Sequence, residues 1–179
     1  MNLAGLILKL AGWKVTVTLP EYPKCIIAVA PHTSNWDFFL GKLAYASIGR
    51  RAGFLMKEAW FFFPLNFILK AIGGIPVPRR RGASLVDSII NKFNQSSRMV
   101  IAITPEGTRS RTSEWRHGLF YIARGANIPI QLAAIDYPTK HISITDELTV
   151  TGDIDADMVA LKKYYSRFTG KYPDKFTTE

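Results

Sequence analysis

The feature that most constrains the fold of this chain is an alternation between short apolar runs and segments of helical periodicity. Apolar runs of strand length occur at 26–30, 53–56, 99–103 and 128–135. The segments with helical spacing of apolar residues are 38–48, 84–95, 117–125 and a stretch that begins at Asp155. Strands that alternate with helices favour an α/β fold, which we predict to be a mixed, largely parallel β-sheet flanked by helices.

The length of the chain favours a single domain. A chain of 179 residues can bury a core that is stable alone, so we predict one domain over residues 1–179. No run approaches the roughly 20 apolar residues that a membrane-spanning helix needs. Residues 1–13 are expected to form a short helix that either lies on a membrane surface, with Trp13 at the headgroup level, or packs on the core. The single Cys25, inside an apolar run, indicates a buried residue in a reducing compartment.

The charge balance points to an anionic partner. The net charge is +9, from 23 lysines and arginines against 14 aspartates and glutamates. A surplus of this size attracts nucleic acid, anionic lipid headgroups or phosphorylated substrates, and charge alone does not choose among them. The aromatic block WFFFPL at 60–65 cannot bury every ring from one element, which fits a membrane-facing patch or an acyl-chain tunnel.

The segment PHTSNWD at 31–37 begins one of the predicted helices. Ser34 and Asp37 have the spacing of a capping box, so a helix cap alone can explain both. That explanation leaves His32 without a role. If His32 lies in the turn before the cap, its ring can reach Asp37, whose carboxylate would orient the imidazole and leave its other nitrogen as a base. At this level both interpretations stand, a cap only and a proton-transfer pair.

Two further polar segments lie near the ends of predicted strands. TPEGTRSR at 104–111 directly follows a strand, and an arginine in such a loop can bind phosphate oxygens through its planar fork. GGIPVPRRR at 73–81 is either a basic surface turn or a phosphate clamp. Because ligand sites of parallel sheets form beyond the carboxyl ends of the strands, these segments and PHTSNWD predict one site. The three histidines lack metal-ligand spacing, so no metal is expected.

Taken together, PHTSNWD, GGIPVPR, TPEGTRSR and ANIPI resemble the bacterial glycerophospholipid acyltransferases, which include lysophosphatidate and glycerol-3-phosphate acyltransferases. Order and spacing agree from about residue 26 to residue 135. The resemblance implies a glycerol-3-phosphate acyltransferase-like fold in a small, single-domain branch. It also implies an O-acyltransferase that moves a fatty acyl group from an acyl-CoA or acyl-carrier-protein thioester to the hydroxyl of a lysophosphatidate-like lysophospholipid. No cofactor beyond that co-substrate is implied.

Carried over by position, the resemblance also implies roles for individual residues. His32 would be the general base that deprotonates the acceptor hydroxyl, and Asp37 would orient it and stabilise its charge. Arg79 matches an arginine that binds the acceptor phosphate. The remaining substrate-binding positions are Glu106, Gly107, Thr108 and Arg109, which would contact the acceptor, and Pro129, which would shape the acyl pocket.

Two departures from the family pattern bear on the acceptor and on the membrane. Pro78 stands where relatives commonly carry an aspartate, so the acceptor headgroup stays open, and an ornithine-type lyso-lipid is an alternative to lysophosphatidate. The docking helices of larger relatives are reduced to about one short helix. Attachment would then rest on the positive charge and the aromatic block, with the protein cytoplasmic and peripheral on the inner face of the cytoplasmic membrane.

Two other classes of function compete with an enzyme. A basic nucleic-acid-binding module fits the charge, but the aromatics are bunched rather than interleaved with lysine and arginine, so no nucleic acid is expected as a partner. A catalytically silent lipid-binding relative fits the apolar segments. The intact pair of His32 and Asp37 argues against the silent relative.

Overall fold

The computed structural model describes residues 2–77 and 84–179 of the chain. In that part, the strands are β1 (Lys14–Val17), β2 (Lys24–Ala30), β3 (Gly53–Lys57), β4 (Gly74–Val77), β5 (Met99–Ile103), β6 (Ile130–Asp136) and β7 (His141–Leu148). The helices are α1 (Leu3–Leu10), α2 (Asn35–Ser47), α3 (Leu65–Ala71), α4 (Leu85–Gln95), α5 (Gly118–Ala126) and α6 (Ile154–Tyr165). Short 3₁₀ turns lie at Glu58–Trp60 and Pro173–Lys175.

All the strands belong to one sheet, in the order β1-β7-β6-β2-β5-β3-β4. The neighbouring strands run parallel except for β6 and β7, which are antiparallel. The predicted fold, a mixed and largely parallel sheet flanked by helices, is therefore confirmed. The carboxyl ends of β2, β5 and β6 consequently lie at the same edge of the sheet, where the chain leaves each strand in a loop.

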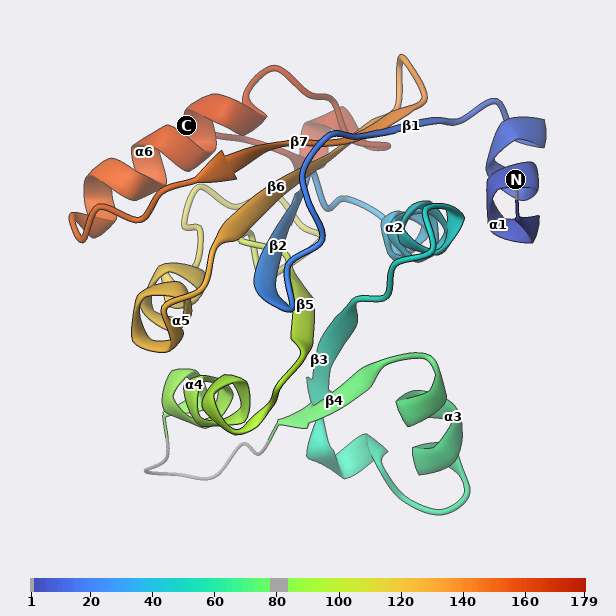
Figure 1. Cartoon of the computed structure of the whole chain (residues 1–179). Helices are drawn as coiled ribbons and strands as arrows, with labels where there is room; N and C mark the ends of the chain where they lie inside the picture. The colour runs from blue at the N-terminus through green and yellow to red at the C-terminus, as the bar shows by residue number, and fades with distance from the viewer. Residues whose placement is uncertain (1, 78–83) are drawn as a thin grey trace.

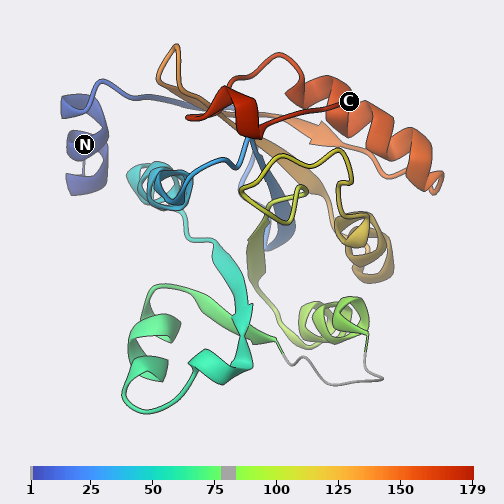
Figure 2. The same cartoon turned by 180° about the vertical axis from the view of Figure 1, so that it is seen from behind.

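Helices cover both faces of the sheet, as the two opposite views in Figures 1 and 2 show. Successive residues of β2 point to opposite faces. Ile26 and Ala28 join the larger core cluster, which packs under α4, α5 and α6, whereas Ile27 joins a cluster with Tyr45 of α2. Burial on both faces explains why the central strands are nearly continuous apolar runs.

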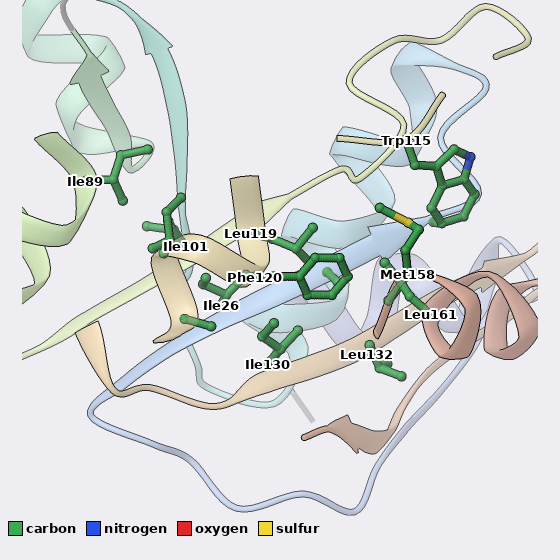
Figure 3. Close-up of a cluster of buried hydrophobic side chains, with 14 of the residues drawn as sticks. Ile26, Ile89, Ile101, Trp115, Leu119, Phe120, Ile130, Leu132, Met158 and Leu161 are labelled. Atoms are coloured by element: carbon green, nitrogen blue, oxygen red, sulfur yellow. The ribbon is translucent and has the colours of Figure 1, made fainter. Parts of the chain in front are cut away.

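The larger core is built where three neighbouring strands meet the helices α4, α5 and α6. Figure 3 shows Ile26, Ile101 and Ile130, one from each of β2, β5 and β6, packed with side chains of α5 and α6. The helical members labelled there are Ile89 of α4, Leu119 and Phe120 of α5, and Met158 and Leu161 of α6. This dry cluster fixes the central strands, and with them the loops at their carboxyl ends.

The four predicted apolar runs correspond to β2, β3, β5 and β6, whereas the sequence does not predict the remaining strands. β1 and β4 are four-residue strands at the two edges of the sheet, too short to give a pattern. β7 does carry a signal, because buried Ile142 and Ile144 alternate with more polar residues. The last helix begins at Ile154, after an Asp153 cap, rather than at Asp155.

The N-terminal helix packs on the core, which is one of the two alternatives predicted for residues 1–13, and the membrane-surface alternative stays a prediction. Leu8 is buried against α2 and the sheet, whereas Leu3 and Leu10 are largely exposed. Trp13 does not project outward as expected at a headgroup level, because its half-buried ring packs edge-on against Tyr137. No helix in the described residues is long and apolar enough to cross a membrane.

Candidate active site

The chain leaves β2 at Ala30 and turns through residues 31–34 into α2. Ser34 is the N-cap of this helix: its side-chain oxygen accepts a hydrogen bond from the backbone N–H of Trp36 at 3.1 Å. In return, Asp37 Oδ2 accepts the backbone N–H of Ser34 at 2.8 Å. This reciprocal capping box fixes the start of the helix, so the capping interpretation of Ser34 and Asp37 is correct.

The same carboxylate also reaches the histidine. His32 Nδ1 lies 3.3 Å from Asp37 Oδ2, with the aspartate side chain 1% exposed and the histidine side chain 19% exposed. The two interpretations of PHTSNWD are therefore compatible, because one carboxylate caps the helix and pairs with the imidazole. With Nδ1 directed at Asp37, Nε2 is the ring nitrogen left to exchange a proton with a bound molecule.

Asp37 is held by more partners than the histidine alone. Its Oδ2 also accepts the backbone N–H of Thr33 at 2.8 Å, and its Oδ1 accepts the Tyr137 hydroxyl at 2.6 Å. Burial disfavours the charged carboxylate, but the hydrogen bonds from His32, Tyr137 and the Ser34 backbone outweigh it and lower the pKa of Asp37. The carboxylate is thus ionised and fixed in one orientation beside the imidazole.

Glu106, in the loop after β5, holds the backbone of His32 through a hydrogen bond from its side chain. Its Oε1 accepts the backbone N–H of His32 at 2.8 Å. Its Oε2 is buried and has no hydrogen-bond partner in the described residues. Burial is the main reason that the pKa of Glu106 rises to about 7. The contact with the acceptor that the sequence predicts for Glu106 stays a prediction, since the structure shows this residue against the His32 backbone.

We expect the buried Glu106 carboxyl to make folding stability fall with rising pH. Its pKa is about 7 in the folded protein against an ordinary 4.5, so the folded state holds the proton more tightly. The stabilisation is fully present below pH 4.5 and is lost as pH rises through 7, by on the order of 3 kcal/mol. Urea unfolding between pH 4.5 and pH 7 should show that the free energy of unfolding falls in the wild type and does not fall in this way in Glu106→Gln. Parallel pH profiles for the two proteins would contradict it.

The rest of the TPEGTRSR loop is shaped by a glycine. Gly107 has φ +67°, and a Cβ there would lie 3.0 Å from the Arg116 side chain, so the turn requires glycine. Thr108 helps to hold the turn, because its hydroxyl accepts the backbone N–H of Ser110 at 3.1 Å. Arg109 is exposed and lines the cavity described next. Of the four predicted loop residues, Arg109 and Glu106 are therefore the two whose side chains face His32 or the cavity.

A cavity of about 680 Å³ lies between α2 and the sheet. His32, Asp37 and Arg109 line it near the carboxyl ends of the strands, and Ile27 and Tyr45 line it further in. The rest of the cavity wall is mainly apolar and is formed by Val29, Phe38, Ala44, Phe54, Leu55, Met56, Ala133, Ile135, Ile142 and Ile144. The cavity therefore places a histidine–aspartate pair beside a long apolar compartment. That arrangement can deprotonate a hydroxyl while holding a hydrocarbon chain.

The other predicted residues lie elsewhere. Pro129 precedes β6 at the opposite end of the sheet from His32, where its carbonyl accepts the Ile26 N–H, and it does not line the cavity. Arg79 falls outside the described residues. His141 contacts the Thr16 hydroxyl at 2.8 Å on the edge of the sheet. No group of three or more His, Cys, Asp or Glu side chains converges in 2–77 and 84–179.

Sequence reasoning misses Tyr137, which donates the shortest hydrogen bond to Asp37. This residue follows β6 at the edge where β2 and β5 also end. The available signal was a tyrosine two residues after the apolar run 128–135, since ligand-site residues of parallel sheets gather at these strand ends. The signal is weak in the sequence alone, because 100 residues separate Tyr137 from Asp37.

Comparison with known proteins identifies a family and a similar fold. The sequence profile of the family described as Acyltransferase matches residues 14–136, which is most of the chain. Among solved structures, the fold is similar to the 1-acyl-sn-glycerophosphate (LPA) acyltransferase PlsC from Thermotoga maritima, at a TM-score of 0.55 and 16% sequence identity. The similarity covers 93% of this chain and 78% of that protein. A comparison with proteins of curated function gave no sequence match.

The match to the family spans both the histidine–aspartate pair and the Glu106 loop, and it ends one residue before Tyr137. The structural similarity independently supports the mixed sheet and its helices. On the extent of the sequence match, the chain belongs to the acyltransferase family.

Proposed function

We propose that the protein is a lysophospholipid O-acyltransferase that takes a fatty acyl group from an acyl-CoA or acyl-carrier-protein thioester. The observation that carries the proposal is the pairing of His32 and Asp37 beside a mainly apolar cavity. A hydroxyl acceptor needs a base, and a fatty acyl chain needs an apolar compartment. Both requirements meet at one place in this chain.

The proposed reaction uses the histidine–aspartate pair as its base. His32 Nε2 removes the proton from the acceptor hydroxyl, and the oxygen attacks the thioester carbonyl carbon. The tetrahedral intermediate collapses with cleavage of the C–S bond, and the leaving thiolate takes the proton back from the imidazolium. Asp37 stabilises the imidazolium through Nδ1 while it forms. A thioester is already activated, so a base and correct positioning supply most of what the enzyme must add.

For the acceptor, the proposal is a lysophosphatidate-like molecule whose phosphate meets arginine. Arg109 is exposed and lines the cavity, which suits a guanidinium that receives a headgroup from solvent. Arg79 is proposed as a second phosphate contact from its position in GGIPVPR. An ornithine-type lyso-lipid is the alternative acceptor, because Pro78 departs from the family pattern.

The cavity makes a specific prediction about acyl-chain length. Gly41 lies on the face of α2 that lines the cavity, and a Cβ there would meet nothing within 4 Å. Gly41→Leu should fill part of the compartment and lower turnover of long-chain donors about tenfold relative to short-chain donors. Leucine also favours the helix over glycine, by about 1 kcal/mol, so unfolding would not explain the loss. The measurement is kcat/KM for both donors.

Gly41→Ala is the matched control for this substitution, because it adds one methyl group and should keep the preference of the wild type. An equal loss of long-chain and short-chain turnover in Gly41→Leu would show that the acyl chain does not occupy this compartment.

The acceptor and product are membrane lipids in this proposal, so the protein would work at an anionic membrane surface, on the cytoplasmic side. Apolar side chains of α1 and of the segment 62–68 are exposed, among them Leu3, Leu10, Phe63 and Phe67. The aromatic block does not line the cavity, and the exposure of Trp60, Phe62 and Phe63 supports the membrane-facing alternative for these rings. The net charge of +9 adds attraction to anionic headgroups. Sedimentation with vesicles should therefore rise when phosphatidylglycerol replaces phosphatidylcholine.

The experiment that tests the function is release of free thiol from each donor type in the presence of a panel of lyso-lipid acceptors. We expect release that depends on the acceptor and a product that carries the new ester. Vesicle binding without thiol release from either donor would instead identify a silent lipid-binding relative. Salt-sensitive binding to DNA or RNA with no thiol release would identify a nucleic-acid-binding module.

A further inference from the structure

The described cavity and the pair beside it leave one strong contact unexplained, the hydrogen bond from the Tyr137 hydroxyl to Asp37 Oδ1 at 2.6 Å. Capping of α2 and pairing with His32 both use the other oxygen, Oδ2. The Tyr137 bond therefore serves neither of them directly. It fills the remaining side of a carboxylate whose side chain is 1% exposed.

Tyr137 is itself fixed in place by its own turn and by groups from two distant parts of the chain. Its backbone N–H donates to the Thr169 carbonyl at 3.0 Å, and its carbonyl accepts the Lys140 N–H at 3.2 Å. Its ring meets the Trp13 ring edge-on, with centroids 5.1 Å apart and planes at 89°. A tyrosine held by three segments can direct its hydroxyl at one oxygen without a large loss of side-chain entropy on binding.

We propose that Tyr137 is a positioning residue that fixes Asp37 and, through it, the His32 imidazole, so that the histidine–aspartate pair is a three-residue chain of Tyr137, Asp37 and His32. The inference rests on the proposed function for its kinetic consequence. Tyr137 does not line the cavity, so it acts through Asp37 and does not touch the substrate.

The hydroxyl has two physical effects on the carboxylate. It stops rotation of the Asp37 side chain, because with both oxygens bonded the carboxylate has one orientation. It also draws negative charge toward Oδ1 and away from Oδ2, the oxygen that faces the imidazole. Burial and the bond to Asp37 both raise the pKa of Tyr137, so the phenol stays protonated and remains a donor.

The test is Tyr137→Phe, which removes the hydroxyl and keeps the ring that packs against Trp13. We expect kcat for acyl transfer to fall about tenfold, the loss typical of one hydrogen bond to a charged group, while KM for donor and acceptor stays unchanged. The melting temperature should fall by a few degrees, because Asp37 Oδ1 loses a buried hydrogen-bond partner. Tyr121→Phe, an exposed tyrosine of α5, is the matched control and should leave kcat unchanged.

A second measurement does not depend on turnover. In Tyr137→Phe, more negative charge faces the imidazole, so the NMR titration of the His32 ring should move to higher pH. The chain has only three histidines, and those at 117 and 141 serve as internal references. Glu106 and Tyr172, the other titratable groups that act on this cluster, are unchanged in the variant.

The outcomes separate the inference from the proposed function. An unmoved His32 titration, or a fall in stability with an unmoved titration, overturns the positioning role of Tyr137. An increase in KM with constant kcat also overturns it, because that pattern belongs to substrate contact. Failure of the wild type to release thiol from any donor would instead overturn the proposed function, and the titration would still decide whether Tyr137 acts on His32 through Asp37.

Discussion

His32→Ala is expected to lower acyl transfer from a thioester by about 10²–10⁴-fold, the usual contribution of a general base. The variant should fold normally, because apart from the contact with Asp37 the interactions that hold the segment do not use the imidazole. Glu106 bonds the backbone N–H of residue 32, and Ser34 and Asp37 still cap α2. The measurement is thiol release at saturating donor and acceptor, together with circular dichroism to establish the fold.

His117→Ala is the matched control for this variant. That histidine precedes α5, is exposed, and makes no side-chain cap there. The control should keep the wild-type rate. Turnover in His32→Ala equal to that of the control would exclude His32 as the base, whatever else the protein does.

Asp37→Asn is expected to lower kcat on the order of 10²-fold and the free energy of unfolding by about 1–2 kcal/mol. The amide keeps an oxygen that can accept the Thr33 and Ser34 N–H groups, so the helix start survives. It loses the negative charge that stabilises the imidazolium, and its nitrogen replaces an oxygen that accepted a hydrogen bond. Activity should therefore fall much further than stability. Steady-state kinetics and urea unfolding measure the two effects.

Asp157→Asn provides the control for stability without catalysis. This buried carboxylate of α6 accepts the backbone N–H and the hydroxyl of Thr151, and it does not line the cavity. It should cost comparable stability and leave kcat unchanged. If Asp37→Asn lost no more activity than Asp157→Asn, the role of Asp37 would be confined to capping.

The fold was predictable where a single element produces its own pattern. The central strands β2, β5 and β6 are buried on both faces and are therefore apolar throughout. The edge strands β1 and β4 do not show a continuous apolar run, because a strand of four residues at an edge buries few side chains. The N-terminal helix was predicted with two possible placements, and the structure shows that Leu8 packs inward while its neighbours stay exposed.

In the candidate site, too, the local features were predictable from the sequence and the contacts between distant segments were not. The pairing of His32 with Asp37 was predictable because both lie within one turn of a helix start, where the capping rule places the carboxylate. Four loop residues, Glu106, Gly107, Thr108 and Arg109, were predicted for the site, but the hydrogen bond that Glu106 accepts from the His32 backbone was not predicted. Pro129 was assigned by resemblance, and the structure puts it at the far end of β6.

The sequence by itself determined the α/β class and the helix cap, and it predicted the histidine–aspartate pair as one of two interpretations, because each of these depends on residues a few positions apart. Three features come only from the tertiary structure. They are the hydrogen bond from Tyr137 to Asp37, the hydrogen bond from the His32 backbone to Glu106, and the cavity beside these residues. These contacts join β2, β5 and β6 at one edge of a parallel sheet. Strand order sets which loops meet there, and strand order comes from packing of the whole core, which no local pattern encodes.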